Sequence, residues 1–162
     1  MSIAIHLCTT IGASSGLVWS EIEDIGTHVE WMADAVSITF RTEQHAGTGT
    51  EFECLTKVGP LSTTDVMTVT EWEPGAVMGI EHRGVVTGRG RFTLRPVGTA
   101  LTEFCWDEEL SYPAWMGGAI GERLSRPVLM RVWSGNLQRL RATIEPKAPP
   151  ASPTSVKART TK

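Results

Sequence analysis

The sequence predicts an α+β fold, in which an antiparallel sheet accompanies one long C-terminal helix. Three observations support it: strand-like stretches in the middle of the chain, short helical segments near its start, and a helical stripe near its end. Alternation of apolar and polar residues is typical of half-buried strands, whereas apolar steps of three and four residues are typical of helices. The length of 162 residues suits a single domain.

The first elements are a strand and two short helices. Residues 3–11 (IAIHLCTTI) are rich in β-branched residues and predict a strand. Ser14 or Ser15 is expected to cap a short helix in LVWSEIEDI, and Gly26 is expected to end it. A second short helix is expected in THVEWMA.

A run of hairpins follows. Strands are expected at 36–42, 49–58, 64–73 and 76–84, and as a pair within 88–110. Short turns that contain Gly or Pro separate these stretches, as antiparallel hairpins require.

The last ordered segment is predicted to be a helix from about Pro127 to Glu145. Its stripe of regularly spaced residues is Leu129, Val132, Trp133, Asn136, Leu137, Leu140 and Ile144. Proline suits the first turn of a helix, where its missing N–H costs nothing.

The piece before this helix, AWMGGAIGERL, contains three glycines and is expected to be a loose helix or a mobile loop. The domain is therefore expected to span residues 1–145, and the Pro/Ser/Thr-rich segment 146–162 is expected to be a disordered basic tail.

Composition excludes several classes of function. The net charge of -3, without a basic cluster in the folded part, argues against a nucleic-acid surface. No apolar run reaches the ~18 residues of a membrane span, and the N-terminus lacks the features of a signal peptide. Cys8, Cys54 and Cys105 have no metal-ligand spacing, and their odd number suits a reducing compartment, so a cytoplasmic protein is expected. No motif for a metal, haem or nucleotide is found, so no cofactor is expected, and the chain is expected to be a monomer or a homodimer.

Three segments carry a resemblance to a known superfamily. They are IGASSGLVWSEIEDIGTHVEWMADA (11–35), TVTEWEPG (68–75) and RFTLRPVGTALTEFCWDEEL (91–110), followed by the final helix. Together they resemble the SRPBCC or START-like superfamily, and its bacterial polyketide cyclase/dehydrase-like branch is the most similar. The resemblance implies the helix-grip fold, a curved antiparallel sheet wrapped around a long C-terminal helix. Ala13-Ser14 and Ala33 depart from positions where the family usually or often has proline. Because the superfamily includes carriers, cyclases, hydrolases and regulators, the fold alone does not fix the function.

Strand parity predicts which side chains line the space between such a sheet and its helix. The inward set is mostly apolar, as expected both for a core and for an apolar ligand site. The expected ligand-binding residues are Phe40, Phe52, Cys54, Ile80, His82, Phe92, Phe104, Trp106, Glu108, Leu129, Trp133 and Asn136. Further inward positions are Val36, Ile38, Thr56, Met78 and Leu94. The strand at 64–73 is ambiguous, because Met67 and Val69 compete with Val66 and Trp72 for the inward face.

Three polar residues, His82, Glu108 and Asn136, interrupt this apolar set. A buried, unpaired carboxylate costs several kcal/mol, so an inward Glu108 must be paired, hydrated or protonated. Other interpretations stay open. A bulge near Asp107 would turn Glu108 towards solvent, His82 would be a hydrogen-bonded or rim histidine, Asn136 would be a polar edge of the helix stripe, and tryptophans such as Trp115 would belong to the core.

The turns predict the neighbours of the two titratable groups. A turn at 97–98 sets Gly88 opposite Glu108, and the preceding turn sets His82 opposite Gly90. His82 and Glu108 then flank a strand whose inward positions carry no side chains. A slip of one residue would turn the whole set outward.

Arginines occupy the opposite parity of the same strand. Arg89, Arg91 and Arg95 are expected to lie on a solvated face, with cross-strand partners such as Glu103 adding less than ~1 kcal/mol.

Three functions are compatible with this pattern. The first is binding or transport of a small hydrophobic molecule, such as a lipid, a polyketide-like or a steroid-like compound, with GGAIG as part of a flexible entrance. The second is an aromatase/cyclase-type or dehydratase-type enzyme in which His82 or Glu108 moves a proton. No second acid–base partner or nucleophile motif supports that enzyme. The third is a regulatory or interaction module, which only the basic tail and the sheet face support.

Overall fold

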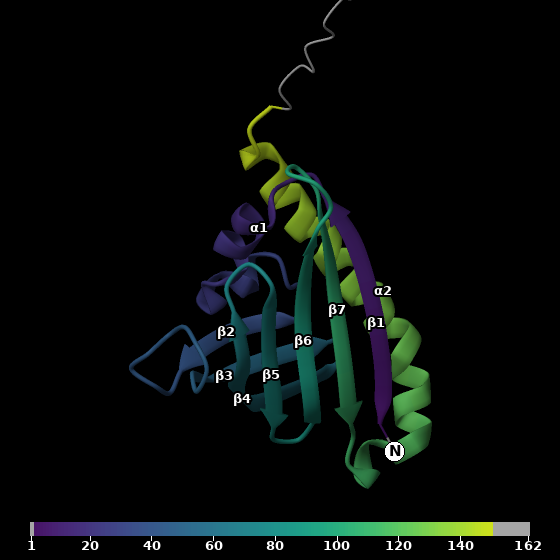
Figure 1. Cartoon of the computed structure of the whole chain (residues 1–162). Coiled ribbons are helices and arrows are strands. Elements are labelled where there is room, and N and C mark those ends of the chain that lie inside the picture. Colours follow the sequence, from purple (N-terminus) through teal and green to yellow (C-terminus); the bar gives the residue numbers. More distant parts are fainter. Residues whose placement is uncertain (1, 151–162) are drawn as a thin grey trace, which may run out of the picture.

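A computed structural model describes residues 2–150 of the chain, apart from the side chains of residues 118 and 119. It shows a curved sheet, two short helical segments at one end of the sheet, and one long helix packed against one of its faces (Figure 1). This confirms the predicted α+β helix-grip fold. Among the described residues, no helix is both long and apolar enough to cross a membrane.

Side-chain caps start the two short helices that follow β1 (Ile3–Ile11). The Ser14 hydroxyl accepts a hydrogen bond from a first-turn backbone N–H and begins α1 (Ser15–Ile22). The Asp24 carboxylate does the same for Gly26 and begins η1 (Ile25–Glu30), a 3₁₀ helix. α1 thus ends earlier than predicted, because the competing cap at Asp24 starts a new helix.

The sheet has seven antiparallel strands in the order β1-β7-β6-β5-β4-β3-β2. The strands after β1 are β2 (Ala35–Phe40), β3 (Glu51–Val58), β4 (Leu61–Glu73), β5 (Val77–Arg83), β6 (Thr87–Pro96) and β7 (Thr102–Ser111). Each strand from β2 to β6 pairs with the next along the chain, and β7 also pairs with β1. The first and last strands of the chain are therefore neighbours.

The register differs from the prediction by two residues. Gly90, not Gly88, lies opposite Glu108, and Gly88, not Gly90, lies opposite His82. The hairpin between β6 and β7 closes through a bond from the Val97 N–H to the Leu101 carbonyl, so its loop is longer than the expected turn. An even shift keeps every side chain on its predicted face.

Parity was wrong for Val36 in β2. This residue is 52% exposed, whereas the preceding Ala35 is buried. The pairing of β2 with β3 shifts between Ala35 and Ser37, and such a bulge locally re-aims side chains.

The long helix α2 (Gly118–Ile144) begins nine residues before the predicted start at Pro127 and includes the glycine-rich piece from Gly118 onward. The start of that piece forms a separate 3₁₀ helix, η2 (Ala114–Met116), which ends at Gly117. Pro127 lies inside α2, where it removes one backbone hydrogen bond. The predicted stripe is buried at Leu129, Trp133, Asn136, Leu137, Leu140 and Ile144.

After α2 the chain forms a short 3₁₀ helix, η3 (Glu145–Lys147). The Lys147 ammonium donates to both Glu21 carboxylate oxygens, at 2.7 and 2.8 Å, which ties this segment to α1. The predicted tail thus starts with an attached turn, and its residues 151–162 lie outside the described residues.

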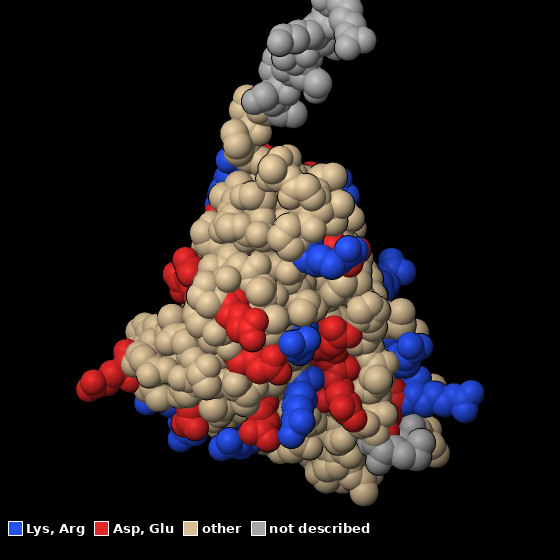
Figure 2. Space-filling view, in the orientation of Figure 1, with Lys and Arg blue, Asp and Glu red and all other residues tan. Residues whose placement is uncertain are grey.

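The outer face of the sheet carries mixed acidic and basic side chains (Figure 2). Arg89, Arg91 and Arg95 are exposed there, as predicted. Arg95 pairs with Glu103 at 3.0 Å, and Arg91 pairs with Glu71 at 3.0 Å. These pairs are exposed, so each adds at most about 1 kcal/mol.

A disulfide joins Cys8 of β1 to Cys105 of β7 on this outer face, whereas Cys54 is a free, buried thiol. The two bonded residues lie directly opposite each other, with Cα atoms 4.1 Å apart. Because two of the three cysteines are bonded to each other, their odd number does not indicate a reducing compartment. The cytoplasmic location stays a prediction.

Candidate functional site

A cavity of about 220 Å³ lies between the inner face of the sheet and α2. Its wall is largely apolar and draws residues from η1, from β2 to β7 and from α2. Nine of the expected binding residues border it: Phe52, Cys54, Ile80, His82, Phe92, Trp106, Glu108, Leu129 and Trp133. Strand parity thus predicts most of the residues that border this cavity, and their binding of a ligand stays a prediction.

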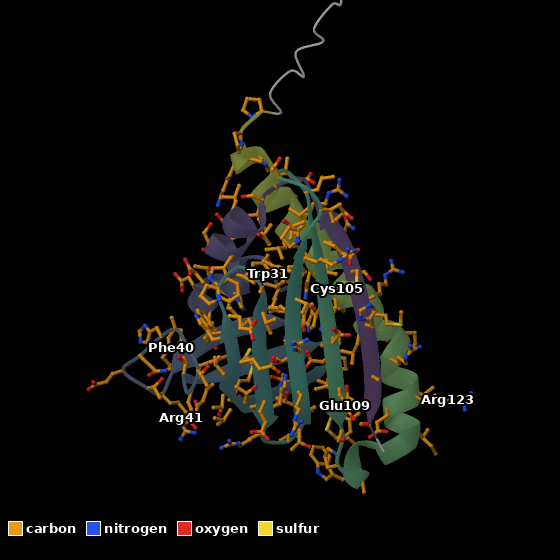
Figure 3. The ribbon with its side chains drawn as sticks, viewed as in Figure 1. Trp31, Phe40, Arg41, Cys105, Glu109 and Arg123 are labelled. Carbon is orange, nitrogen blue, oxygen red and sulfur yellow. A yellow bond between two sulfur atoms is a disulfide. The ribbon has the colours of Figure 1, made fainter. Side chains whose placement is uncertain are left out.

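Three expected binding residues do not border the cavity. Phe104 is fully buried in the core between sheet and helix. Phe40 lies at the outer end of β2 (labelled in Figure 3), where its ring stacks on His45 with centroids 3.9 Å apart. Asn136 is fully buried and hydrogen-bonds protein groups on both sides of its amide.

His82 and Glu108 meet inside the cavity. The His82 Nε2 and Glu108 Oε1 atoms lie 2.7 Å apart, and the two side chains are 11% and 4% exposed. Their approach does not have hydrogen-bond geometry, so among the described residues both atoms are buried without a hydrogen-bond partner. The second carboxylate oxygen, Oε2, accepts a 2.7 Å bond from the indole N–H of Trp106. One carboxylate oxygen of Glu108 is therefore hydrogen-bonded, and the other can still accept a hydrogen bond.

Gly90 gives the carboxylate of Glu108 its room. It lies opposite Glu108 across β6 and β7, and a Cβ at this position would come within 2.6 Å of Oε2. Gly90 thus provides the predicted gap in the strand beside Glu108. Even alanine there requires the carboxylate to move.

Aromatic rings form one wall of the cavity. The Trp106 and Trp133 rings are stacked, with centroids 4.9 Å apart and planes inclined by 21°. Phe92 meets Trp106 edge to face at 5.2 Å. Offset and edge-to-face contacts are favourable for aromatic pairs, so this wall is a rigid apolar surface.

A buried polar network fixes α2 against the segment before β2. The Asp34 carboxylate accepts bonds from the Trp133 indole at 3.0 Å and from the Asn136 amide at 2.7 Å. The Asn136 oxygen in turn accepts from the Ala33 N–H at 2.9 Å. Asn136 thus anchors the helix instead of facing a ligand, and the network positions Trp133 in the cavity wall.

Sequence reasoning missed several polar residues of the cavity. Asp65 is buried in β4 and accepts a bond from the Val86 N–H at 3.2 Å. Tyr112 follows β7 and also borders the cavity. The alternation of Met67 and Val69 extends back to Asp65, and that of Glu108 and Leu110 extends forward to Tyr112, so period-two spacing could have found both.

Burial keeps two further cavity groups neutral. It raises the pKa of the Cys54 thiol, so Cys54 is a small apolar wall residue and not an activated nucleophile. Burial also raises the pKa of the Tyr112 phenol, which therefore stays protonated and can donate a hydrogen bond.

His28 of η1 borders the cavity as a neutral imidazole. Its Nε2 lies 2.7 Å from the Ile22 carbonyl, to which the ring donates. Desolvation by burial lowers its pKa from 6.5 to about 4, and the bond to Ile22 offsets only part of that effect.

We expect this histidine to weaken the fold in acid. Between pH 7 and pH 5 the unfolded chain protonates His28 and the folded chain does not, because the folded pKa is about 4 against 6.5 when exposed. Stability present above pH 6.5 is thus lost as the pH falls, by about 2 kcal/mol at pH 5. Urea unfolding of the protein and of His28→Gln at both pH values measures this loss. The variant is expected to be less stable at pH 7 but to lack that share of the pH dependence, whereas exposed His45→Gln keeps it. Equal pH dependence in His28→Gln and the native protein contradicts the assignment.

One end of α2 combines cavity wall and exposed apolar surface. Gly121 and Val128 border the cavity, and a Cβ at Gly121 would come within 2.2 Å of the Met116 carbonyl oxygen. Exposed apolar side chains on this end are Trp115, Ile120, Leu124 and Val128. Trp115, at 76% exposed, is therefore not a core residue.

Comparisons with known proteins agree with this architecture. Residues 3–145 match the model of the family described as polyketide cyclase/dehydrase and lipid transport. The aromatase/cyclase Zhui from Streptomyces sp. R1128 superposes with a TM-score of 0.77 at 13% identity, over 94% of this chain and 99% of that one. A START superfamily protein from Mycobacterium smegmatis gives 0.73 at 11% identity, over 90% of this chain and 99% of that one. The di-domain aromatase/cyclase StfQ of the steffimycin pathway gives 0.74 at 11% identity, over 91% of this chain and 52% of that one. At such identities the likeness shows the fold alone, and no curated protein matches the sequence.

Proposed function

The chain belongs to the polyketide cyclase/dehydrase and lipid transport family, and from this premise we propose that it binds a compact apolar molecule carrying one polar group. The observation that carries the proposal is the pair of buried polar atoms, His82 Nε2 and Glu108 Oε1, that face an otherwise apolar cavity. Pockets with apolar walls and a few convergent polar groups are the usual form of small-molecule sites.

The cavity's chemistry defines the ligand class. Its volume of about 220 Å³ lies below the roughly 300–1,000 Å³ of drug-sized pockets, which favours a small ring system over a long lipid chain. The stacked Trp106 and Trp133 rings offer a flat apolar wall. A hydroxyl on the ligand can donate to Glu108 Oε1 and accept from His82 Nε2, which satisfies both atoms at once. The glycine-containing end of α2 is the proposed entrance.

A pair of probes that differ by one hydroxyl tests the role of Glu108. We expect 1-naphthol to bind more tightly than naphthalene, because its hydroxyl gives the buried Oε1 a hydrogen-bond partner, and a buried polar atom without a partner costs about 1–3 kcal/mol. Glu108→Leu is expected to weaken 1-naphthol binding by ~10-fold or more and to leave naphthalene binding almost unchanged. Fluorescence titration measures both affinities, and Glu109→Leu on the exposed face of the same strand is the matched control.

A cavity-filling variant tests where the probes bind. Ile80→Trp places a large ring in the cavity and is expected to abolish binding of both probes. Retained binding in this variant, with the fold intact by circular dichroism, places the probes elsewhere and rejects the proposal. Mass spectrometry of an organic extract of the natively purified protein then identifies the natural ligand.

The close approach of His82 and Glu108 also supports a second function, an aromatase/cyclase-type or dehydratase-type reaction. In that reaction His82 takes a proton from a carbon next to a bound carbonyl, and Glu108 stabilises the resulting imidazolium across the 2.7 Å gap. General acid–base catalysis contributes typically 10²–10⁴-fold. His82→Gln combined with Glu108→Gln is therefore expected to reduce turnover of a cyclisable polyketide by about that factor. Unchanged turnover removes both residues from any mechanism and leaves binding as the function.

A further inference from the structure

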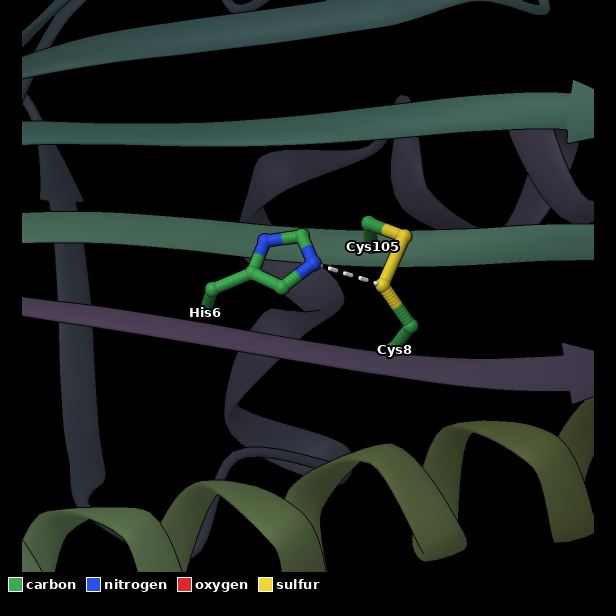
Figure 4. A group of neighbouring side chains, drawn as sticks. All are labelled: His6, Cys8 and Cys105. Carbon is green, nitrogen blue, oxygen red and sulfur yellow. Dashed lines mark hydrogen bonds between the residues drawn. A yellow bond between two sulfur atoms is a disulfide. The ribbon is translucent and has the colours of Figure 1, made fainter.

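A second cluster of chemically active side chains lies on the outer face of the sheet, away from the cavity. The His6 Nε2 atom is 3.2 Å from the Cys8 sulfur, and Cys8 is bonded to Cys105 (Figure 4). On its other side, the His6 Nδ1 atom contacts the Asp107 carboxylate at 2.5 Å. The nitrogen and the two sulfurs all lie within 4.8 Å of one another.

The sheet register builds this cluster from two strands. His6 lies opposite Asp107, and Cys8 lies opposite Cys105, in the antiparallel pairing of β1 with β7. Alternation turns all four side chains to the outer face, while Leu7 and Trp106 turn inward. The cluster therefore sits on rigid backbone and not on a loop. Its sulfurs differ in access, because Cys8 is exposed and Cys105 is half-buried.

The donor set is that of a thiophilic divalent cation. Thiolate sulfur and imidazole nitrogen are the ligands that Zn²⁺ prefers, and two sulfurs with one nitrogen leave a fourth tetrahedral position open. A metal-binding histidine usually has its other ring nitrogen on a carboxylate, which fixes the ring and raises its basicity. Asp107 holds Nδ1 of His6 in this manner and directs Nε2 towards the sulfurs.

We propose that the reduced form of this cluster binds one Zn²⁺-type cation through Cys8 Sγ, Cys105 Sγ and His6 Nε2, with water or an added ligand in the fourth position. Reduction breaks the sulfur–sulfur bond, takes two electrons and two protons from a dithiol reductant and converts that reductant to a disulfide. Binding of the cation then releases the two thiol protons, because thiolates are the ligands. Exchange with an oxidised disulfide compound reverses the step: the two thiolates give up two electrons to that disulfide, which becomes a dithiol, the bond between Cys8 and Cys105 re-forms, and the cation is released. The site is thus open to metal only in the reduced protein.

The oxidation state is the first control of the experiment. Untagged protein is reduced with dithiothreitol, desalted without oxygen, and titrated with Co²⁺ as a spectroscopic probe for Zn²⁺. The reduced protein is expected to take up one Co²⁺ per chain, with a thiolate-to-cobalt charge-transfer band that Zn²⁺ abolishes by displacement. Oxidised protein is expected to show no such band. Circular dichroism before and after reduction verifies that the sheet persists.

Single substitutions assign the ligands. Cys8→Ser and Cys105→Ser are each expected to abolish the charge-transfer band of the folded, reduced protein. His6→Gln is expected to weaken Co²⁺ binding by at least ~10-fold, and Asp107→Asn, which acts through His6, by roughly 10–100-fold.

Two control variants exclude other sources of the signal. Cys54→Ser removes the buried thiol and His45→Gln removes an exposed histidine, and both are expected to keep the band. No uptake by folded, reduced protein overturns the proposal, and so does a band that persists in Cys8→Ser. Loss of the fold on reduction also overturns it, because the site requires the paired strands.

Discussion

Replacing both Cys8 and Cys105 with serine is expected to lower the free energy of unfolding by about 4 kcal/mol. The bond joins residues separated by 97 positions, so it closes a long loop in the unfolded chain. Closing a loop restricts the unfolded ensemble, and the chain-entropy estimate grows with loop length. Urea unfolding of the oxidised protein and of the double variant, both in buffer without reductant, measures the difference.

The native protein in dithiothreitol provides the matched control for this prediction. Its midpoint in urea is expected to fall to that of the double-serine variant, because both then lack the cross-link. A double variant within about 1 kcal/mol of the oxidised protein contradicts the expected stabilisation, since the effect of so long a loop exceeds that value.

Replacing Phe104 with alanine is expected to destabilise the fold by about 3–5 kcal/mol, as truncation of a buried phenylalanine typically does. Its ring is completely buried and packs against Phe92 with ring centroids 5.2 Å apart. The loss combines the transfer free energy of the ring with the void that it leaves. Thermal or urea unfolding of the variant checks the value.

Phe40→Ala is the comparison for this substitution, because both rings were predicted to line the cavity. Phe40 is half-buried and stacks on an exposed histidine, so its truncation is expected to cost clearly less. Similar losses in the two variants contradict the placement of Phe104 in the core. Neither ring borders the cavity, so neither substitution is expected to remove a direct ligand contact.

Sequence periodicity predicted faces better than it predicted partners. The inward direction of Phe52, Trp106 and Glu108 followed from alternation alone, which is insensitive to a register shift of two residues. The opposite neighbour of Glu108 depended on the length of the hairpin loop, and the bond from Val97 to Leu101 makes that loop longer than expected. The glycine beside Glu108 was therefore misassigned, although the expected gap exists at Gly90.

Interactions between distant residues lay beyond the reach of the sequence pattern. Asn136 stood in the helix stripe and was expected to face a ligand, but its partner Asp34 is 102 positions away. Cys8 and Cys105 have outward parity, and only the adjacency of the first and last strands brings them together. That adjacency depends on the strand order of the whole sheet, which the spacing of residues along the chain does not reveal.

The disulfide also covalently closes one part of the chain and leaves α2 outside that closed part. Residues 8–105 form a covalent circle, all strand pairings fall within residues 3–111, and α2 follows as a segment outside the circle. α2 supplies Leu129 and Trp133 to the cavity wall but no hydrogen bond to the sheet ladder. The backbone pairing of the sheet is thus complete without α2, but the core is not, because Leu137, Leu140 and Ile144 of this helix are buried in the same cluster as Phe104. The cross-link therefore restrains the strands directly, whereas core packing and the hydrogen bonds of Asn136 hold α2 over the cavity.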